Sequence, residues 1–495
     1  MIQFNNIPEN VRTPDVFTEV DNSRALQSLV ANPHKVLILG QKIAAGTAEY
    51  DTIYQITKEG LEDGYFGPGS ILARMCAVFK DNNQNTELHA MALGSGVGGT
   101  AASATINFSA ALNAAEASVA GTYYLLVNGA KCYVDITVSM SGMAIASLAA
   151  SIINANSDLP VKATVGVSLF ISAVCSGTVG NYINIRHNYY AGQSIPTCFS
   201  AEPTIVSMVG GATDPDLGDA WAVIEGEQYH YIIQPYITAT ALTEIEDELE
   251  DRFGPMVDMQ GHGFAAVRGT VASCTTLGNS RNSPHNTIVG AYDSPTAPEE
   301  WAAALGAIAA NYLNNDPARP LQFLKLKGVL APPVENRFVQ SERNTLLFDG
   351  IATWVCDSTG NVMIERCITS YQKNAYGIAD PSYLDVETLA TLGEIRYQYK
   401  ARMVQRFLLP RYKLADDTFN VPPGSYIVTP KTIKQEIIAL FTNLQDIGLV
   451  ENIDEFADNL VVERDESDKN KVRVLLPPDL VNQFRVLAGV IQFIL

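Results

Sequence analysis

The pattern of apolar and polar positions predicts that strands and helices alternate over two parts of the chain. The apolar run KVLILG, at residues 35–40, ends in glycine and is typical of a strand buried on both faces. A helix and another strand follow it. The same rhythm resumes after Leu217 with helices such as the one predicted at 298–313, which has Pro before an acidic first turn. This alternation predicts a mostly parallel sheet covered by helices. We therefore expect an α/β core domain made of residues 31–93 and 210–350.

The stretch between these two parts is rich in Ala, Ser, Thr and Gly and poor in charge. It contains several runs that predict strands, one of which turns at the Asn-Gly pair of Asn128 and Gly129. One helix is predicted at 143–156. Glycine clusters bound the stretch on both sides. We expect residues 94–209 to form a β-rich domain inserted into a surface loop of the α/β domain.

After Gly350 the pattern changes to a hairpin, two long helices and a second hairpin with a charged turn. The longest helix is predicted at 385–409, where Pro410 ends it. Its apolar stripe at helical spacing consists of Leu392, Ile395, Tyr399 and Met403. We expect residues 351–495 to form a C-terminal α+β domain, so that the whole chain is an α/β protein of several domains.

The last predicted strand, residues 482–495, is apolar on both faces. Its apolar side chains include Phe484, Val486, Leu487, Val490, Ile491 and Phe493. Such a strand belongs in the middle of a covered sheet, and unpaired at a chain terminus it would be an aggregation hazard. Two interpretations stay open: an internal strand of the C-terminal domain, or a strand that this subunit donates to a neighbour.

The opposite end, residues 1–30, is predicted to be an extended arm. Its segment PDVFTEVD contains Val16, Phe17 and Val20 and predicts one short strand with no partner strand nearby. A lone strand at a terminus must pair with something distant in the sequence or in another chain.

Composition excludes several classes of function. The formal net charge is −20 and the pI is about 4.7, so the chain repels phosphate and is not expected to bind nucleic acid over a broad surface. No apolar run reaches the roughly 18–20 residues of a membrane helix, and the N-terminus does not resemble a signal peptide. Seven cysteines without a C-x-x-C pair indicate free thiols in a reducing cytoplasm. We expect no insertion into a membrane.

No catalytic, cofactor-binding or metal-binding residues are predicted. The motif Gly94-x-Gly96-x-x-Gly99 follows a strand and matches the dinucleotide fingerprint, but the sequence after it predicts a strand where a phosphate site needs a helix. We interpret it as a flexible hinge into the insert. The six histidines lack metal-ligand spacing, and hydrolase, P-loop and zinc-protease motifs are absent. A Rossmann-like nucleotide-binding enzyme remains the alternative hypothesis.

A basic patch stands out in this acidic chain. It consists of Arg396, Lys400, Arg402 and Arg406, with Arg411 and Lys413 beyond them. The pairs 396/400 and 402/406 have i, i+4 spacing, so each pair shares a face of the predicted helix. The patch is either an ordinary solvated face or a docking face for an acidic protein partner.

Two terminal motifs are specific: IPENVRTPDVFTEVDNSRA at residues 7–25 and VRVLLPPDLVNQFRVLAGVIQFIL at residues 472–495. With these motifs the sequence resembles the tail sheath proteins of Mu-like contractile phages. In the middle of the chain, GGATDPDL and GNYINIRHNY are similar as well. The similarity extends over the whole length, and the insert is its least diagnostic part.

The resemblance implies a structural subunit that stacks in hexameric rings around an inner tail tube, as a helical homopolymer. Both terminal arms would pair with strands of neighbouring copies, and contraction would drive the tube through the host envelope for genome ejection. The C-terminal domain would lie inward, where the basic patch could face the tube, and the insert would project outward. Baseplate and tail terminator proteins would be further partners of this virion component, which would be assembled in the host cytoplasm. A tail-tube or fibre protein is the other alternative, and the chain length argues against it.

Overall fold

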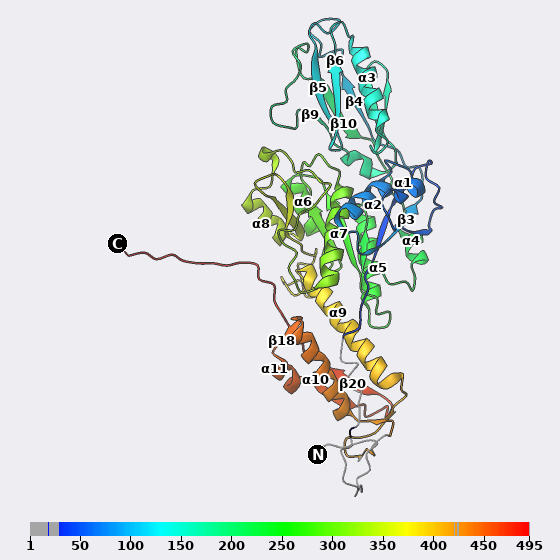
Figure 1. Ribbon diagram of the computed structural model, residues 1–495, viewed down its shortest axis with the longest axis vertical. Coiled ribbons are helices and arrows are strands. Elements are labelled where there is room, and N and C mark those ends of the chain that lie inside the picture. Colours follow the sequence, from blue (N-terminus) through cyan, green and yellow to red (C-terminus); the bar gives the residue numbers. More distant parts are fainter. Residues whose placement is uncertain (1–17, 19–28, 420, 423–424, 495) are drawn as a thin grey trace. The chain divides into compact units, whose positions relative to one another are not determined.

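Figure 1 shows the computed structural model of the chain, which describes residues 18, 29–419, 421–422 and 425–494. The chain divides into two compact units. The larger unit consists of Pro33–Asn315 and Leu321–Val386, and the smaller unit contains the remaining described residues. The predicted N-terminal strand with Val16, Phe17 and Val20 lies outside the described residues.

The larger unit is built on an eight-stranded sheet with a parallel centre. In spatial order its strands are β15 (Val362–Arg366), β14 (Ile351–Cys356), β13 (Asn286–Gly290), β12 (His262–Val267), β11 (Tyr231–Ile233), β1 (Lys35–Gln41), β3 (Glu87–Leu93) and β2 (Ile53–Gln55). Neighbours from β14 to β3 run parallel, and only β15 and β2 at the edges run antiparallel. The central strands are buried on both faces, which explains their continuous apolar sequences. The predicted mostly parallel sheet is confirmed.

The hairpin of β14 and β15 belongs to this sheet, whereas the sequence placed it in a C-terminal domain starting at residue 351. β14 pairs with β13 in parallel, with Ile351 opposite Ile288. The two units divide between Val386 and Glu387 instead. A hairpin sequence shows that two strands pair with each other, but not which further strand lies on their outer edge.

Helices cover both faces of the sheet. One face carries α2 (Ile71–Asn82) and α7 (Pro298–Asn315), and the other carries α5 (Ala239–Phe253), α6 (Val271–Asn279) and α8 (Gln340–Phe348). The alternation along β12 follows this arrangement: Phe264 lies beside Gly306 of α7, whereas Ala265 joins the cluster formed with Leu242 and Cys274. Two shorter helices, α1 (Leu61–Phe66) and α4 (Gly218–Val223), complete the periphery.

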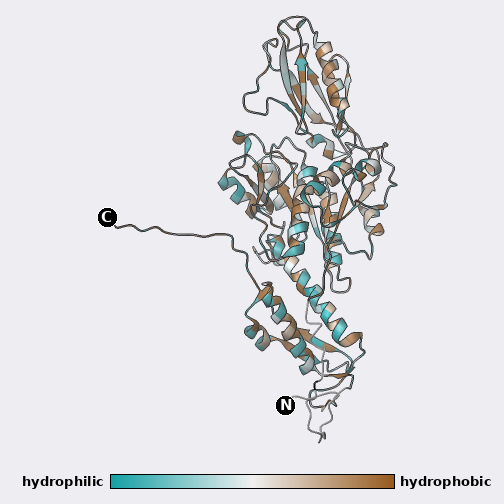
Figure 2. Ribbon diagram, in the orientation of Figure 1, coloured by the Kyte–Doolittle hydropathy of each residue, from teal (hydrophilic) through white to brown (hydrophobic). Residues whose placement is uncertain are grey.

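The predicted insert has its own apolar core. Its four-stranded sheet has the order β10 (Thr204–Val209), β4 (Ser103–Asn107), β8 (Leu169–Ala173), β7 (Val161–Val165), and its three-stranded sheet has the order β6 (Ala130–Ile136), β5 (Gly121–Val127), β9 (Ile185–His187). A 3-10 turn, η1 (Thr178–Tyr182), precedes β9. The mostly apolar helix α3 (Gly142–Ala155) packs one face against β7 and β6 (Figure 2). The Asn-Gly hairpin is confirmed, because Asn128 and Gly129 have φ angles of 49° and 79° between β5 and β6.

The smaller unit contains the long helix α9 (Val386–Met403), which continues into a π-helical segment (Val404–Leu408), and two further helices, α10 (Pro430–Asp446) and α11 (Ile453–Asn459). Its strands form three two-stranded ladders: β16 (Lys413–Leu414) with β17 (Ile427–Val428), β18 (Val450–Glu451) with β21 (Asp479–Leu480), and β19 (Val461–Arg464) with β20 (Val472–Leu475). Ile437, Phe441 and Phe456 lie at the centre of its core. The structure assigns no helix or strand to residues 481–494, where the sequence predicted a strand.

Candidate functional sites

The glycine motif at the border of the insert does not have the surroundings of a dinucleotide site. The chain runs from it into β4, a strand, so the helix that would face a pyrophosphate is missing. A Cβ on Gly96 would lie 2.5 Å from the carbonyl oxygen of Asp214, and one on Gly99 would lie 3.1 Å from the carbonyl oxygen of Thr213. These glycines therefore let two chain segments cross closely. The border is packed backbone against backbone, which corrects the expected flexible hinge.

The described residues contain neither a group of three or more His, Cys, Asp or Glu side chains placed to hold a metal ion nor a helix with the length and apolar character needed to cross a bilayer. All seven cysteines are free, and six of them are buried. Burial raises the pKa of several of these thiols, to about 11 for Cys132 and to about 12 for Cys274, so their reactive thiolate form is disfavoured.

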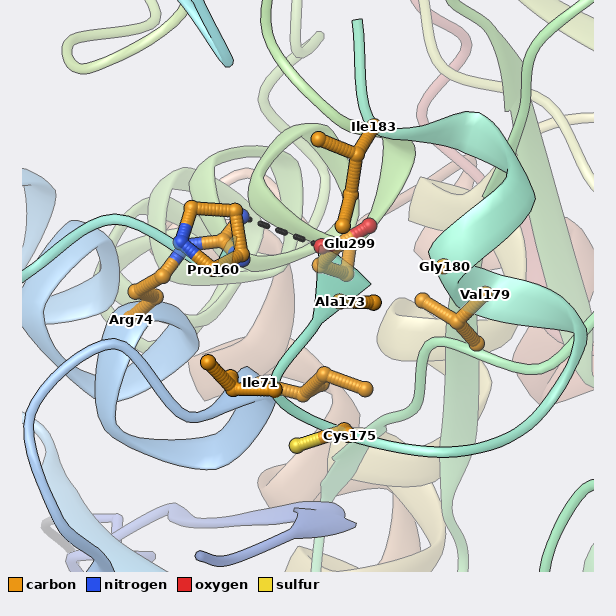
Figure 3. A pocket seen from close by; sticks show the side chains of 10 residues that line it. Ile71, Arg74, Pro160, Ala173, Cys175, Val179, Gly180, Ile183 and Glu299 are labelled. Carbon is orange, nitrogen blue, oxygen red and sulfur yellow. Dashed lines mark hydrogen bonds and ion pairs between the residues drawn. The ribbon is translucent and has the colours of Figure 1, made fainter. Parts of the chain in front are cut away.

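The crevice in which open α/β sheets usually bind ligands is filled by the chain itself. The strand order reverses between β1 and β11, and ligands normally bind at the carboxyl ends of such strands. Next to this point, the guanidinium of Arg74 binds Glu299 and Glu300 in the first turn of α7, with 3.0 Å between Arg74 Nη2 and Glu299 Oε1. The cavity there has about 10 Å³, room for one water-sized molecule, and residues of the insert such as Ala173 close it (Figure 3). A nucleotide does not fit at this position.

The same acidic cluster holds the tip of the insert. Asn128 Nδ2 donates a hydrogen bond to Glu300 Oε1 at 3.0 Å, and its Oδ1 accepts one from the backbone N–H of Ala297 at 2.9 Å. The side chain of Asn128 therefore satisfies a free donor at the start of α7. Burial raises the pKa of Glu299, and Arg74 opposes that shift. The hairpin tip is thus part of the polar interior of the larger unit.

A second polar contact joins the insert to the α/β core at Asp293. Arg186 of the insert and Arg268 of the core each donate to Asp293 Oδ1 at 2.8 Å, and Asn336 donates to its Oδ2 at 3.1 Å. Burial alone would raise the pKa of Asp293, but the two guanidinium groups hold it below its usual value. The insert is therefore fixed to the core at two separate charged clusters.

The helix α9 carries a buried polar stripe that sequence analysis missed. Glu387, Thr391, Gln398 and Arg402 are 0%, 1%, 2% and 6% exposed. With 100° per residue, Glu387, Glu394 and Gln398 lie within about 40° of one another around the helix axis. Spacings of three and four residues between polar side chains could have revealed the stripe. The prediction followed only the apolar stripe, of which Ile395 is buried and Tyr399 and Met403 pack against the core.

The N-terminal segment 29–32 runs along this polar stripe. The amide of Gln398 pairs with both backbone groups of Val30: its Oε1 accepts from the N–H at 2.9 Å, and its Nε2 donates to the carbonyl at 2.7 Å. Asn32 Nδ2 donates to Glu394 Oε2 at 3.0 Å, and the hydroxyl of Tyr397 donates to the carbonyl of Ala31 at 3.1 Å. This end of the chain is attached to α9 by backbone-directed hydrogen bonds.

The C-terminal segment meets the same stripe at the start of α9. Arg485 Nη2 lies 2.9 Å from Glu387 Oε1, and the two side chains are 12% and 0% exposed. Beyond Arg485, the side chains predicted to pair between subunits are exposed: Val486 80%, Leu487 84%, Val490 86%, Ile491 93% and Phe493 79%. Phe484, just before Arg485, is 70% exposed. In Figure 1 this segment extends away from the helices of the smaller unit as an isolated stretch of backbone without secondary structure.

The four cations of the predicted basic patch have different surroundings. Arg402 is buried against α10, with its Nε 2.5 Å from Glu436 Oε1, and the Nε of Arg406 lies 3.1 Å from the same oxygen. Lys400 is exposed and Arg396 is half-buried. The i, i+4 reasoning grouped these residues by helix position, but the acidic partner lies 30 or more residues away in sequence, on another helix. Arg402 is thus a packing residue of the smaller unit.

Comparisons with known proteins indicate a class of structural tail proteins. A model of the phage tail sheath protein central domain matches residues 210–370, and one of the phage tail sheath C-terminal domain matches residues 379–494. Two solved structures share the fold: the sheath tail protein of Desulfitobacterium hafniense (TM-score 0.50, 12% identity, 95% of this chain and 97% of that chain) and the helical sheath of the anti-feeding prophage in its contracted state (TM-score 0.50, 10% identity, 98% and 99%).

The chain is also 38% identical to the Mu-like prophage FluMu tail sheath protein of Haemophilus influenzae, over 495 residues and the full length of both chains. It therefore belongs to the phage tail sheath family, as its terminal motifs predicted. It is a tail sheath protein of the Mu-like kind, a structural component of the virion and not an enzyme.

Proposed function

We propose that this chain polymerises as stacked hexameric rings of a contractile sheath around an inner tail tube. Shortening of the sheath drives the tube through the host envelope and leads to genome ejection. The observation that carries the proposal is the C-terminal segment 486–494, whose apolar side chains are exposed in the single chain. Burying each large side chain is worth roughly 1.5–3 kcal/mol, so the segment gains most when a second copy covers it.

Strand donation supplies the link between copies. Among its described residues, the smaller unit presents two-stranded ladders such as β19 with β20, and two-stranded ladders are marginal by themselves. The outer strands carry exposed apolar side chains, including Val461 at 46% and Leu475 at 62%. A C-terminal segment from another copy would add a strand to such an edge through backbone hydrogen bonds. The N-terminal strand with Val16, Phe17 and Val20 would act as a second tether.

The inner face of the sheath would use the part of the basic patch that is exposed or half-buried. Arg396, Lys400 and Arg406 would face an acidic surface of the tube, with Arg402 holding α9 against α10 from within. The insert would project outward. The ends of the sheath would contact baseplate and tail terminator proteins, and assembly would take place in the host cytoplasm, with neither nucleic acid nor a membrane as a direct partner.

Truncation after Arg485 tests the assembly role. The cut keeps the ion pair with Glu387 and removes only the exposed segment, so the monomer is expected to keep its thermal unfolding transition. Negative-stain microscopy is expected to show tubes or rings for the full chain and none for the truncated chain. Tubes from the truncated chain would show that the segment is not the link. Loss of cooperative unfolding would show that the segment belongs to its own subunit's core.

A further inference from the structure

The roots of both chain ends lie on one line of α9. Glu387, which binds Arg485, and Gln398, which binds Val30, are eleven residues apart, or about 16 Å along a helix that rises 1.5 Å per residue. Eleven residues correspond to just over three whole turns, so the two side chains point in nearly the same direction. Each is almost completely buried, at 0% and 2% exposure. Val30 and Arg485, which are more than 450 residues apart in the sequence, thus bind to the same stripe.

We propose that the polar stripe of α9 is the common anchor of both terminal arms, and that Glu387 and Gln398 are positioning residues for assembly. This inference rests on the proposed function, because it concerns the point at which each arm leaves its own subunit. A force that a neighbouring copy exerts on either arm is then transmitted to the same helix, α9. The segment beyond Arg485 would pair with another copy, while the roots at Val30 and Arg485 stay fixed.

The chemistry of the two contacts suits a fixed root. The amide of Gln398 makes two hydrogen bonds to one residue, Val30, which sets both its position and its orientation. The guanidinium of Arg485 is held by the carboxylate of Glu387, from which solvent is excluded. Removing one partner of a buried ion pair strongly destabilises the folded state. Neither contact depends on the identity of the residues farther along the arm.

An anchored root also raises the effective concentration of the donated strand. Without the Glu387 contact, the flexible part of the arm would begin after β21 at Leu480 and not after Arg485. The chance that a tethered segment reaches a fixed site falls at least as steeply as the −3/2 power of its linker length. A longer free linker also allows more alternative registers. The anchor therefore favours donation to one neighbour in one register.

The double variant Glu387→Gln with Arg485→Met removes this ion pair and both of its charges. We expect the critical concentration for polymerisation, measured by sedimentation, to rise about tenfold, while the melting temperature of the monomer changes by less than a few degrees. The control is Arg343→Met with Glu365→Gln, a less buried pair of similar distance (2.8 Å) in the larger unit, and it should polymerise like the parent. An unchanged critical concentration in the first double variant would overturn the anchor.

Gln398→Leu provides a second test that does not involve charge. It removes both hydrogen bonds to Val30 and is expected to raise the critical concentration several-fold. This test remains informative if the first double variant folds poorly. A value within twofold of the parent would contradict the common anchor. Truncation after Arg485 separates this result from the proposed function: tubes that persist without residues 486–495 refute strand donation itself, whereas their loss together with normal assembly of Gln398→Leu refutes only the anchor.

Discussion

The insert and the C-terminal segment both project from the rest of their units, yet their contacts are completed in opposite ways. The insert closes on its own chain: Asn128 caps α7, and Arg186 and Arg268 share Asp293. The C-terminal segment is attached to α9 through Arg485, and beyond Arg485 its apolar side chains are exposed. Polar atoms that are satisfied within the chain mark a fixed structural part, whereas exposed apolar atoms on an extended backbone mark a surface that another copy must cover.

Among single substitutions, the loss of the Arg74 contact with Glu299 and Glu300 is expected to have the largest effect. Arg74→Ala leaves Glu299 and Glu300 buried without their cation, which should lower the free energy of unfolding by roughly 3–5 kcal/mol. Urea denaturation of the monomer measures this. The control is Arg464→Ala, because Arg464 pairs with the exposed Asp416 and its loss should cost about 1 kcal/mol or less. Equal effects of the two variants would show that the acidic cluster does not hold the unit together.

Acid should destabilise the larger unit through histidines at the amino ends of its parallel strands. Burial lowers the pKa of His34 to about 4, while burial, His34 and Lys35 lower that of His230 to about 3, and burial with His285 lowers that of His262 to about 3. The unfolded chain then binds more protons than the folded one below pH 6.5. Stability is complete above that pH and is lost as the pH falls toward 4, by roughly 2–3 kcal/mol for each histidine.

The variant His34→Phe sharpens this prediction, since a phenyl ring can keep the stacking on His230, where the ring centroids are 4.1 Å apart. We expect the difference in unfolding free energy between pH 7 and pH 4.5 to shrink by about 2 kcal/mol relative to the parent. Urea denaturation at a series of pH values gives this difference. Identical pH profiles of variant and parent would exclude His34 as a contributor.

Removing the cap at the insert tip should have a smaller effect. Asn128→Gly keeps the left-handed backbone conformation but loses the hydrogen bonds to Ala297 and Glu300, at a cost of about 1–2 kcal/mol. Asn128→Ala should cost somewhat more, because its φ of 49° is unfavourable for alanine. Thermal unfolding of both variants checks the order. A neutral Asn128→Gly would show that the tip merely rests against the core.

The smallest effect is expected from a charge reversal at the exposed Lys400 of the smaller unit. Lys400→Glu should weaken association between sheath and tube by less than about tenfold, and the loss should diminish as salt is added. Co-sedimentation with tube protein at several salt concentrations measures it, with sheath polymerisation alone as the control. Unchanged association at low salt would contradict a contact between Lys400 and the tube.

Predictions from the sequence were reliable where the apolar pattern of one continuous segment indicates which of its residues are buried. The strand KVLILG and the helix from Pro298 have continuous apolar patterns, and both are buried as expected. The turn at Asn128 was predicted because an Asn-Gly pair tolerates the left-handed conformation. The sequence pattern placed the hairpin at 351–366 in the wrong domain, since its outer neighbour β13 lies about 60 residues earlier in the chain.

The sequence by itself determined the helices, most strands, the existence of the insert, the apolar C-terminal segment and the family. Only the tertiary structure decided which polar groups meet: Arg402 with Glu436, Arg74 with Glu299, and both chain ends with one stripe of α9. The physical reason is that apolar burial has no direction and shows itself in local periodicity, whereas hydrogen bonds and ion pairs need particular atoms at close range. Those atoms come from distant parts of the sequence and are brought together by folding.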